Sequence, residues 1–232
     1  MNLERKQYKT EYQGRPLSFE ISRSAEQATA AVLGRYGDTA VLATVVMGDK
    51  EEDIDYFPLK VDYEERFYAA GKILGSRFVR REGRPSDEAV LSGRVIDRTI
   101  RPLFDQRLRR EVQVVATVLE IDEENDPDFI ALLTTSLALS ISKIPWGGPV
   151  AGLKLFHDGK KLVINPLNSE LKERWPVDRG FLGFVSGTQD RINMIEMEAL
   201  DGEEDVVAKA FVDAQKEISG LIEWQQTIIK EI

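Results

Sequence analysis

The first half of the chain alternates apolar and polar residues in short runs that are separated by turn residues. A period of two is typical of β-strands with one buried face. The longest run, residues 39–47, is rich in β-branched side chains, which favour extended backbone. The pattern therefore predicts that several strands come first, at residues 7–13, 17–22, 30–35, 39–47 and 56–63.

Residues 64–85 contain several Gly and Arg residues and show no periodicity, which is typical of either a functional loop or partial disorder. A helix is predicted after this loop. Ser86 is a suitable N-cap, and Asp87 and Glu88 would complement the positive end of the helix dipole. Pro102 predicts that the helix ends near Arg101.

The second half begins with a β-branched run at residues 111–122, which predicts a buried strand. Asp126 and Pro127 then supply an N-cap and a proline at the first helical position. The following segment, residues 128–142, is almost wholly apolar or small, so the helix that it predicts should be central. A hairpin at 150–156 and 161–164, a loop at 165–178 and strands at 181–186 and 192–199 complete this part.

From Glu203 the apolar residues recur at helical spacing and continue to do so until the end of the chain. Helix-forming composition persists beyond Gly220. The sequence stops inside this pattern, without a Gly, Pro or capping residue after Ile232. We therefore expect the chain to be a fragment of a longer protein.

The composition limits the possible chemistry. Hydrophobic residues make up 42% of the chain, enough for a substantial core, and no apolar run approaches the length of a membrane span. The N-terminus is polar, so we expect a cytoplasmic protein. The absence of Cys excludes disulfides and thiolate metal sites, and the single histidine, His157, excludes a His-cluster zinc site. A hydrated magnesium ion held by carboxylates remains possible. His157 precedes a predicted turn and is expected to be solvent-exposed.

Charge is distributed unevenly along the chain. The net charge is −9, yet residues 72–110 contain eleven Lys or Arg and five Asp or Glu. Ten of these eleven cations are Arg, which can bind phosphate oxygens through two hydrogen bonds and can stack on bases. Because attraction to phosphate reaches only about 8 Å at physiological salt, a local cationic strip can bind nucleic acid on an acidic protein. Phe78 lies within the strip, and interleaved aromatic and Arg side chains suit single-stranded nucleic acid.

The alternative is that these arginines form a solvated surface or pair with acidic neighbours such as Asp97. The helical spacing of the arginines favours nucleic-acid binding over this alternative. At about 100° per residue, Arg94, Arg98 and Arg101 fall on one side of the predicted helix. Leu91, Val95, Ile96 and Ile100 fall on another side, which we expect to be buried.

With these motifs, the chain resembles the N-terminal part of the polynucleotide phosphorylase family, over nearly its whole length. The most specific segments are residues 80–86, RREGRPS, and residues 94–104, RVIDRTIRPLF. Residues 37–44, 138–145 and 194–198 add support. The resemblance implies an α+β fold, with a mixed sheet and packed helices of the RNase PH type, related to a domain of a ribosomal protein. It implies domains at residues 1–202, a first RNase PH-like core, and 203–232, the start of an all-helical linker.

The resemblance also implies a function. The family degrades RNA, including mRNA, from the 3′ end by phosphorolysis, with inorganic phosphate as co-substrate and Mg²⁺ as cofactor. It forms a homotrimeric ring whose channel is lined by the loop that matches Phe78, Val79, Arg80 and Arg81. Val79 stands where the family often has a second aromatic residue, and Arg77 is an additional residue before Phe78.

Phosphorolysis requires a bound phosphate and a divalent ion held by closely placed carboxylates. In the segment that matches the active cores of the family, Asp178 is the one candidate, and an exposed loop carboxylate is the more plausible interpretation. The acidic run at residues 122–126 is expected to be a solvated loop. No residue is therefore assigned to catalysis or to a metal, and Mg²⁺ is expected in a second core absent from this chain.

We therefore expect the RNA-binding first core of a phosphorolytic exoribonuclease, inactive as an isolated fragment. The alternative is a ring-forming scaffold that threads single-stranded RNA without turnover. The expected RNA-binding residues are Phe78, Arg80, Arg81, Arg84, Arg94, Arg98 and Arg101.

Overall fold

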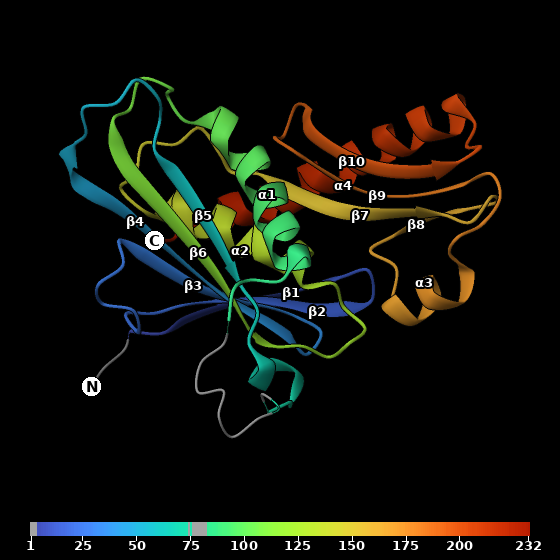
Figure 1. Ribbon diagram of the computed structural model, residues 1–232, viewed down its shortest axis with the longest axis horizontal. Helices are drawn as coiled ribbons and strands as arrows, with labels where there is room; N and C mark the ends of the chain where they lie inside the picture. Colours follow the sequence, from blue (N-terminus) through green and yellow to red (C-terminus); the bar gives the residue numbers. More distant parts are fainter. Residues whose placement is uncertain (1–3, 74, 76–82) are drawn as a thin grey trace.

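The computed structural model describes residues 4–73, 75 and 83–232, and it contains two β-sheets with helices packed between and around them (Figure 1). The first sheet has the strand order β1-β2-β3-β4-β6-β5, and the second has the order β10-β9-β7-β8. All strand pairs are antiparallel except β5 and β6, which run parallel. The predicted α+β fold is confirmed.

The strands of the first sheet are β1 (Lys6–Tyr12), β2 (Arg15–Ile21), β3 (Ala30–Tyr36), β4 (Thr39–Glu51), β5 (Leu59–Glu64) and β6 (Arg110–Glu120). Their inner face is apolar, as the alternation predicts. In β6, Val112, Val114, Ala116 and Val118 are buried, and the residues between them are partly exposed. The sheet therefore turns one face to the core and the other toward solvent.

Helix α2 (Pro127–Ile141) lies in the centre of the molecule, packed against β3 and β4 on one side and β7 on the other. Every residue from Phe129 to Leu139 is buried. Gly34 on β3 allows close contact, because a Cβ there would lie 2.0 Å from Thr134 Oγ1. The predicted central helix is confirmed.

The second sheet contains β7 (Ala151–His157), β8 (Leu162–Ile164), β9 (Gly180–Gly187) and β10 (Ile192–Leu200). The short helix α3 (Asn168–Arg174) lies where the sequence predicted a loop. Tertiary contacts hold it, since Asn168 Nδ2 donates to the Glu123 carbonyl and Ser169 Oγ donates to Glu124 Oε2. A seven-residue helix of this kind has too little periodicity to be seen in the sequence.

His157 is buried, with 7% of its surface exposed, so the expectation of an exposed turn residue was wrong. The physical reason is its register. His157 is the last residue of β7 and pairs with Leu162 on β8 and with Phe181 on β9, so it lies inside the sheet. Its ring stacks on Phe181, and its Nδ1 accepts a hydrogen bond from the Gly159 N–H.

The last helix, α4 (Glu204–Lys230), is continuous through Gly220 and crosses behind the second sheet (Figure 1). It contacts β7, β9 and α2, and Trp224 near its end stacks on Phe19 of β2. Its helical character is as predicted. The division of the chain at residue 202 stays a prediction. Among the helices of the described residues, none combines the length and apolar character needed to span a lipid bilayer.

Candidate nucleic-acid interface

Helix α1 (Asp87–Ile100) carries two of the predicted RNA-binding arginines and begins as the sequence predicted. Ser86 Oγ accepts a hydrogen bond from the Ala89 N–H at 3.0 Å, and Asp87 and Glu88 occupy the first turn. A short 3-10 turn that contains Pro102 follows the last residue of the helix. The cap and the proline therefore fix both ends of the helix.

The inner side of α1 packs against β5. Val95, Ile96 and Ile100 are buried, as expected. Leu91 is 50% exposed, so its assignment to the buried side was wrong. Its side chain instead lines a cleft between α1 and the second sheet, which is not filled by other side chains.

Arg94 and Arg98 are exposed on α1 and lie one helical turn apart. Neither guanidinium group forms a hydrogen bond or an ion pair with another residue in the described ranges. Both are therefore available to a ligand as far as the described residues are concerned.

Arg101 has intramolecular partners. Its Nε donates to Asp97 Oδ2 at 2.8 Å, and its Nη2 donates to Asp97 Oδ1 and to the Leu59 carbonyl. This arrangement connects the end of α1 to the start of β5. Arg101 thus differs from Arg94 and Arg98, because its guanidinium group joins two elements of the fold.

Arg84 is exposed and lines a hollow before the N-terminus of α1. Phe78, Arg80 and Arg81 lie outside the described residues. Their assignment to RNA binding, like that of the other four arginines, stays a prediction.

Two adjacent hollows lie beside α1. They share the lining residues Tyr63, Glu64, Pro85 and Ala89. The first has a volume of about 540 Å³ and is lined by Phe67, Lys72 and Arg84, among others. The second, of about 500 Å³, is lined by Lys60, Asp62, Arg94 and Asp97, among others. The arrangement brings Arg84 and Arg94 to neighbouring concave surfaces.

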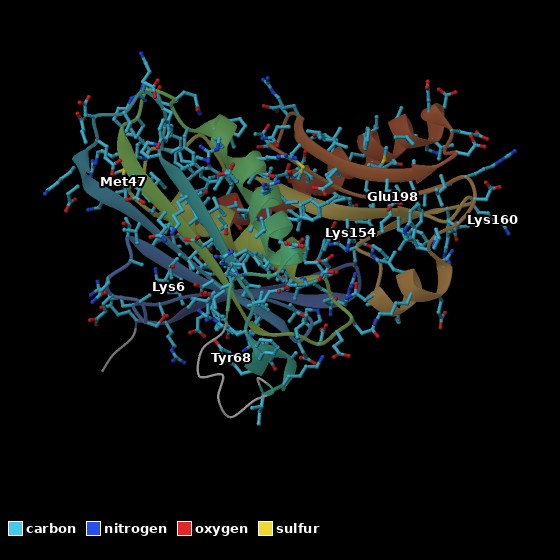
Figure 2. The ribbon with its side chains drawn as sticks, in the orientation of Figure 1. Lys6, Met47, Tyr68, Lys154, Lys160 and Glu198 are labelled. Atoms are coloured by element: carbon cyan, nitrogen blue, oxygen red, sulfur yellow. The ribbon has the colours of Figure 1, made fainter. Side chains whose placement is uncertain are left out.

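A third cleft, of about 610 Å³, lies between α1 and the second sheet, and its character is different. Seven charged side chains line this cleft. One is a lysine, Lys154, and six are acidic: Glu65, Glu88, Asp126, Asp128, Glu196 and Glu198. Lys154 is already paired with Asp126. Figure 2 shows Lys154 and Glu198 on strands of the second sheet beside α1. This acidic cleft repels anions.

Asp128 lies at the first turn of α2 and contributes to the acidic cleft. Burial, together with the nearby charge of Asp126, raises the pKa of Asp128 to about 7. Ser92 Oγ donates a hydrogen bond to Asp128 Oδ2 at 2.9 Å and so connects α1 to α2. Burial and the neighbouring acids Asp128 and Asp126 also raise the pKa of Tyr63 well above its usual value.

The acidic run at residues 122–126 is a loop, as expected, but the loop is partly buried and hydrogen-bonded rather than simply solvated. Asp122 Oδ1 accepts hydrogen bonds from the Glu124 and Asn125 N–H groups, and Thr39 Oγ1 donates to the same oxygen. Burial alone would raise the pKa of Asp122, but the hydrogen bonds that its carboxylate accepts from Asn125, Glu124 and the Asp38 N–H outweigh burial and lower the pKa overall. Asn125 is 4% exposed. The physical reason is that backbone N–H groups and Thr39 satisfy the carboxylate in place of water.

Within the described residues, no group of three or more His, Asp or Glu side chains is arranged to hold a metal ion. Asp178, the one metal-ligand candidate from the sequence, is exposed in the turn before β9.

Sequence analysis did not single out two residues that the structure brings to these hollows, Lys60 and Phe67. Lys60 lies on a strand outside the basic strip, so its position beside Arg94 depends on the packing of α1. Phe67 could have been noticed, since it follows Arg66 in a segment without periodicity. Lys72 belongs to the basic strip but was not assigned a site.

Comparison with known proteins identifies the family. Residues 13–145 match the model described as "3′ exoribonuclease family, domain 1". The chain is 48% identical to a polyribonucleotide nucleotidyltransferase of Caldicellulosiruptor bescii over 231 residues, which are 99% of this chain and 32% of that protein. It is 45% identical to the enzyme of that name from Halalkalibacterium halodurans over 232 residues, 100% of this chain and 32% of the relative. The chain thus spans about a third of the length of these curated relatives.

Two solved structures have the same fold. Rice Rrp46 superposes with a TM-score of 0.69 at 12% identity, covering 97% of this chain and 95% of that one. An Archaeoglobus fulgidus exosome, solved with RNA bound to its active site, superposes with a TM-score of 0.65 at 17% identity, covering 88% and 87%. These likenesses and the family match confirm the RNase PH fold. The chain therefore belongs to the 3′ exoribonuclease family and contains its domain 1.

Proposed function

We propose that this chain is the RNA-binding first core of a phosphate-dependent 3′-to-5′ exoribonuclease that shortens RNA and releases nucleoside diphosphates. The observation that carries the proposal is a pair of exposed arginines on α1, Arg94 and Arg98, whose guanidinium groups have no partner in the described part of a chain of this family. Guanidinium groups without a carboxylate partner among the described residues favour phosphate oxygens as ligands. The names of the curated relatives support the reaction.

We infer that bond breaking takes place in a second core outside this chain. The acidic cleft supports this inference, because a phosphate ion entering it would meet six acidic side chains, most of them ionised, and a lysine that is already paired. The second core would supply Mg²⁺ and the site for inorganic phosphate. We also propose that the protein forms a homotrimeric ring around single-stranded RNA and acts in the cytoplasm in mRNA degradation.

An activity assay tests whether this chain binds RNA without degrading it. The chain is incubated with a labelled oligo(A), inorganic phosphate and Mg²⁺, and the products are separated by chromatography. We expect RNA binding without release of ADP, whereas a full-length relative run in parallel releases ADP. Release of ADP by the isolated chain at the rate of the relative would refute the assignment of this core as inactive. Ring formation without any RNA binding would support the scaffold alternative.

Measurements of RNA affinity test whether Arg94 and Arg98 contact RNA. Replacing Arg94 and Arg98 together with Ala should lower the affinity for oligo(A) and should flatten the plot of log K against log salt by about 0.7 per lost phosphate contact. The same direction is expected for Arg80 and Arg81 replaced together. The measurement is fluorescence anisotropy at several salt concentrations.

Arg101→Ala is the matched comparison. Because Arg101 holds Asp97 and the backbone of β5, this change should lower the free energy of unfolding. A change in salt slope as large as that for Arg98→Ala would show that RNA contacts Arg101 as well. Unchanged binding after loss of Arg94 and Arg98 would contradict the proposed interface.

A further inference from the structure

The hollow before the N-terminus of α1 has the size of a small-molecule site. Its volume of about 540 Å³ lies within the range of roughly 300–1,000 Å³ that is typical of ligand pockets. We propose that this hollow, called the base pocket below, binds one unpaired nucleobase of RNA, stacked on Phe67, with Lys72 and Arg84 holding its phosphates. The inference rests on the proposed function and adds a site for a base to a surface so far described only for phosphates.

Phe67 supplies the stacking surface. It is 45% exposed although it is a large apolar side chain, and it lines the base pocket. The 3-10 turn Phe67–Ala70 is fixed in place, because the Ile121 N–H donates to the Ala69 carbonyl at 3.0 Å and the Lys72 N–H donates to the Phe67 carbonyl at 2.9 Å. Tyr68, labelled in Figure 2, marks this turn beyond the end of the first sheet. A ring held on an anchored turn loses little conformational entropy when a base stacks on it.

The charges around the pocket suit the phosphates on either side of a bound base. Lys72 and Arg84 are exposed, and the side chain of neither forms a hydrogen bond or ion pair with another residue of the described part of the chain. Arg66, the third cation of the lining, is paired with Glu64. Two cations therefore remain for phosphate, and they lie on the same lining as the aromatic ring.

The carboxylate of Glu65, which lines the base pocket, should make the pocket select among bases. Ser86 Oγ donates to Glu65 Oε2 at 2.8 Å, which orients the carboxylate and leaves Oε1 without a described partner. An ionised carboxylate only accepts hydrogen bonds. It can accept one from the exocyclic amino group of adenine, whereas it repels the carbonyl oxygens of uracil. The base pocket should therefore prefer adenine to uracil.

The experiment uses the 232-residue chain and an oligo(A) that contains one 2-aminopurine, a base whose fluorescence is quenched on stacking. With the unaltered chain we expect quenching on binding. Phe67→Ala should abolish the quenching and weaken binding roughly five- to tenfold, with an unchanged salt slope because no counterion-releasing contact is lost. Phe67→Tyr keeps the stacking ring and should retain both signals.

Tyr56→Ala is the control, since Tyr56 is 62% exposed and lines none of the three hollows. It should leave affinity and quenching unchanged. Lys72→Gln should flatten the salt slope by about 0.7 without loss of quenching. Oligo(U) should bind more weakly than oligo(A), and Glu65→Gln, which adds a donor, should narrow that difference.

The outcomes separate the two proposals. If Arg94 and Arg98 prove necessary for binding while Phe67→Ala changes neither affinity nor quenching, the base pocket is refuted and the proposed interface stands. If the unaltered chain does not bind oligo(A) at all, the proposed function fails and the base pocket fails with it. Equal loss of quenching in Tyr56→Ala and Phe67→Ala would also refute the base pocket.

Discussion

At the scale of single residues, the most unusual group is the Asp128 carboxyl at the start of α2. Four side chains face it: Tyr63 on β5, Ser92 on α1, Asp126 at the N-cap of α2 and Lys154 on β7. Burial and the charge of Asp126 raise its pKa to about 7, although Ser92 and Tyr63 donate hydrogen bonds to it and Lys154 attracts it. The folded chain therefore favours the neutral acid, whereas the unfolded chain ionises it near the ordinary pKa of 3.8.

This difference predicts how stability depends on pH. Between about pH 4 and pH 7 the folded chain binds a proton that the unfolded chain has lost, so this group makes the free energy of unfolding fall as the pH rises. The loss between pH 6 and pH 8 is on the order of 1 kcal/mol. Asp128→Asn should remove this contribution and flatten the pH dependence in urea denaturation. Asp178→Asn, in an exposed turn, is the control, and an equal flattening in both variants would contradict the assignment.

At the scale of elements, the sequence predicted most helices and strands because their patterns are local. The cap at Ser86, the stop at Pro102 and the alternation in β6 each depend on a few neighbouring residues. The errors have a common cause. Each misjudged residue is surrounded by segments that are distant in the sequence. Leu91 faces residues of β10, His157 pairs with β9, and the run at 122–126 is bonded to Thr39. The same holds for the interface, where the α1 arginines follow from periodicity but Lys60 and Phe67 join them through packing.

The packing of α2 on β3 gives a prediction at this scale. Gly34→Ala should destabilise the chain by about 1–3 kcal/mol, since the added Cβ meets Thr134 Oγ1 at 2.0 Å and Ile130 Cδ1 at 3.0 Å. Gly220→Ala is the matched change, at an exposed position of α4 where, among the described residues, the added Cβ has open space within 4 Å. It should stabilise by about 1 kcal/mol through helix propensity. Urea denaturation measures both, and a neutral Gly34→Ala would show that α2 can move away from the sheet.

At the scale of the whole molecule, α4 connects the two sheets. Its buried residues include Ile218, Leu221, Ile222 and Ile228, and each buried side chain of this type contributes about 1.5–3 kcal/mol. Together they are comparable with the total stability of a typical domain, about 5–15 kcal/mol.

A truncation tests whether residues 1–202 fold independently. We expect the chain that ends at Gly202 to lose cooperative unfolding, as followed by circular dichroism in urea, because the faces of β7, β9 and α2 that α4 covers become exposed. A chain that ends at Lys230, which lacks only two exposed residues, should unfold like the parent chain. Cooperative unfolding of residues 1–202 at the parent midpoint would instead support a domain boundary at that position.

The contact between Trp224 and Phe19 has a consequence for biosynthesis. A ribosome adds about 5–20 residues per second, so the aromatic partner of Phe19 is made on the order of 10–40 s after it. During that interval the apolar patch on β2 lacks its cover, and the nascent chain offers it to chaperones or to other nascent chains. Phe19 therefore meets this aromatic partner only after nearly the whole chain has been translated, although its own strand is among the first to be made.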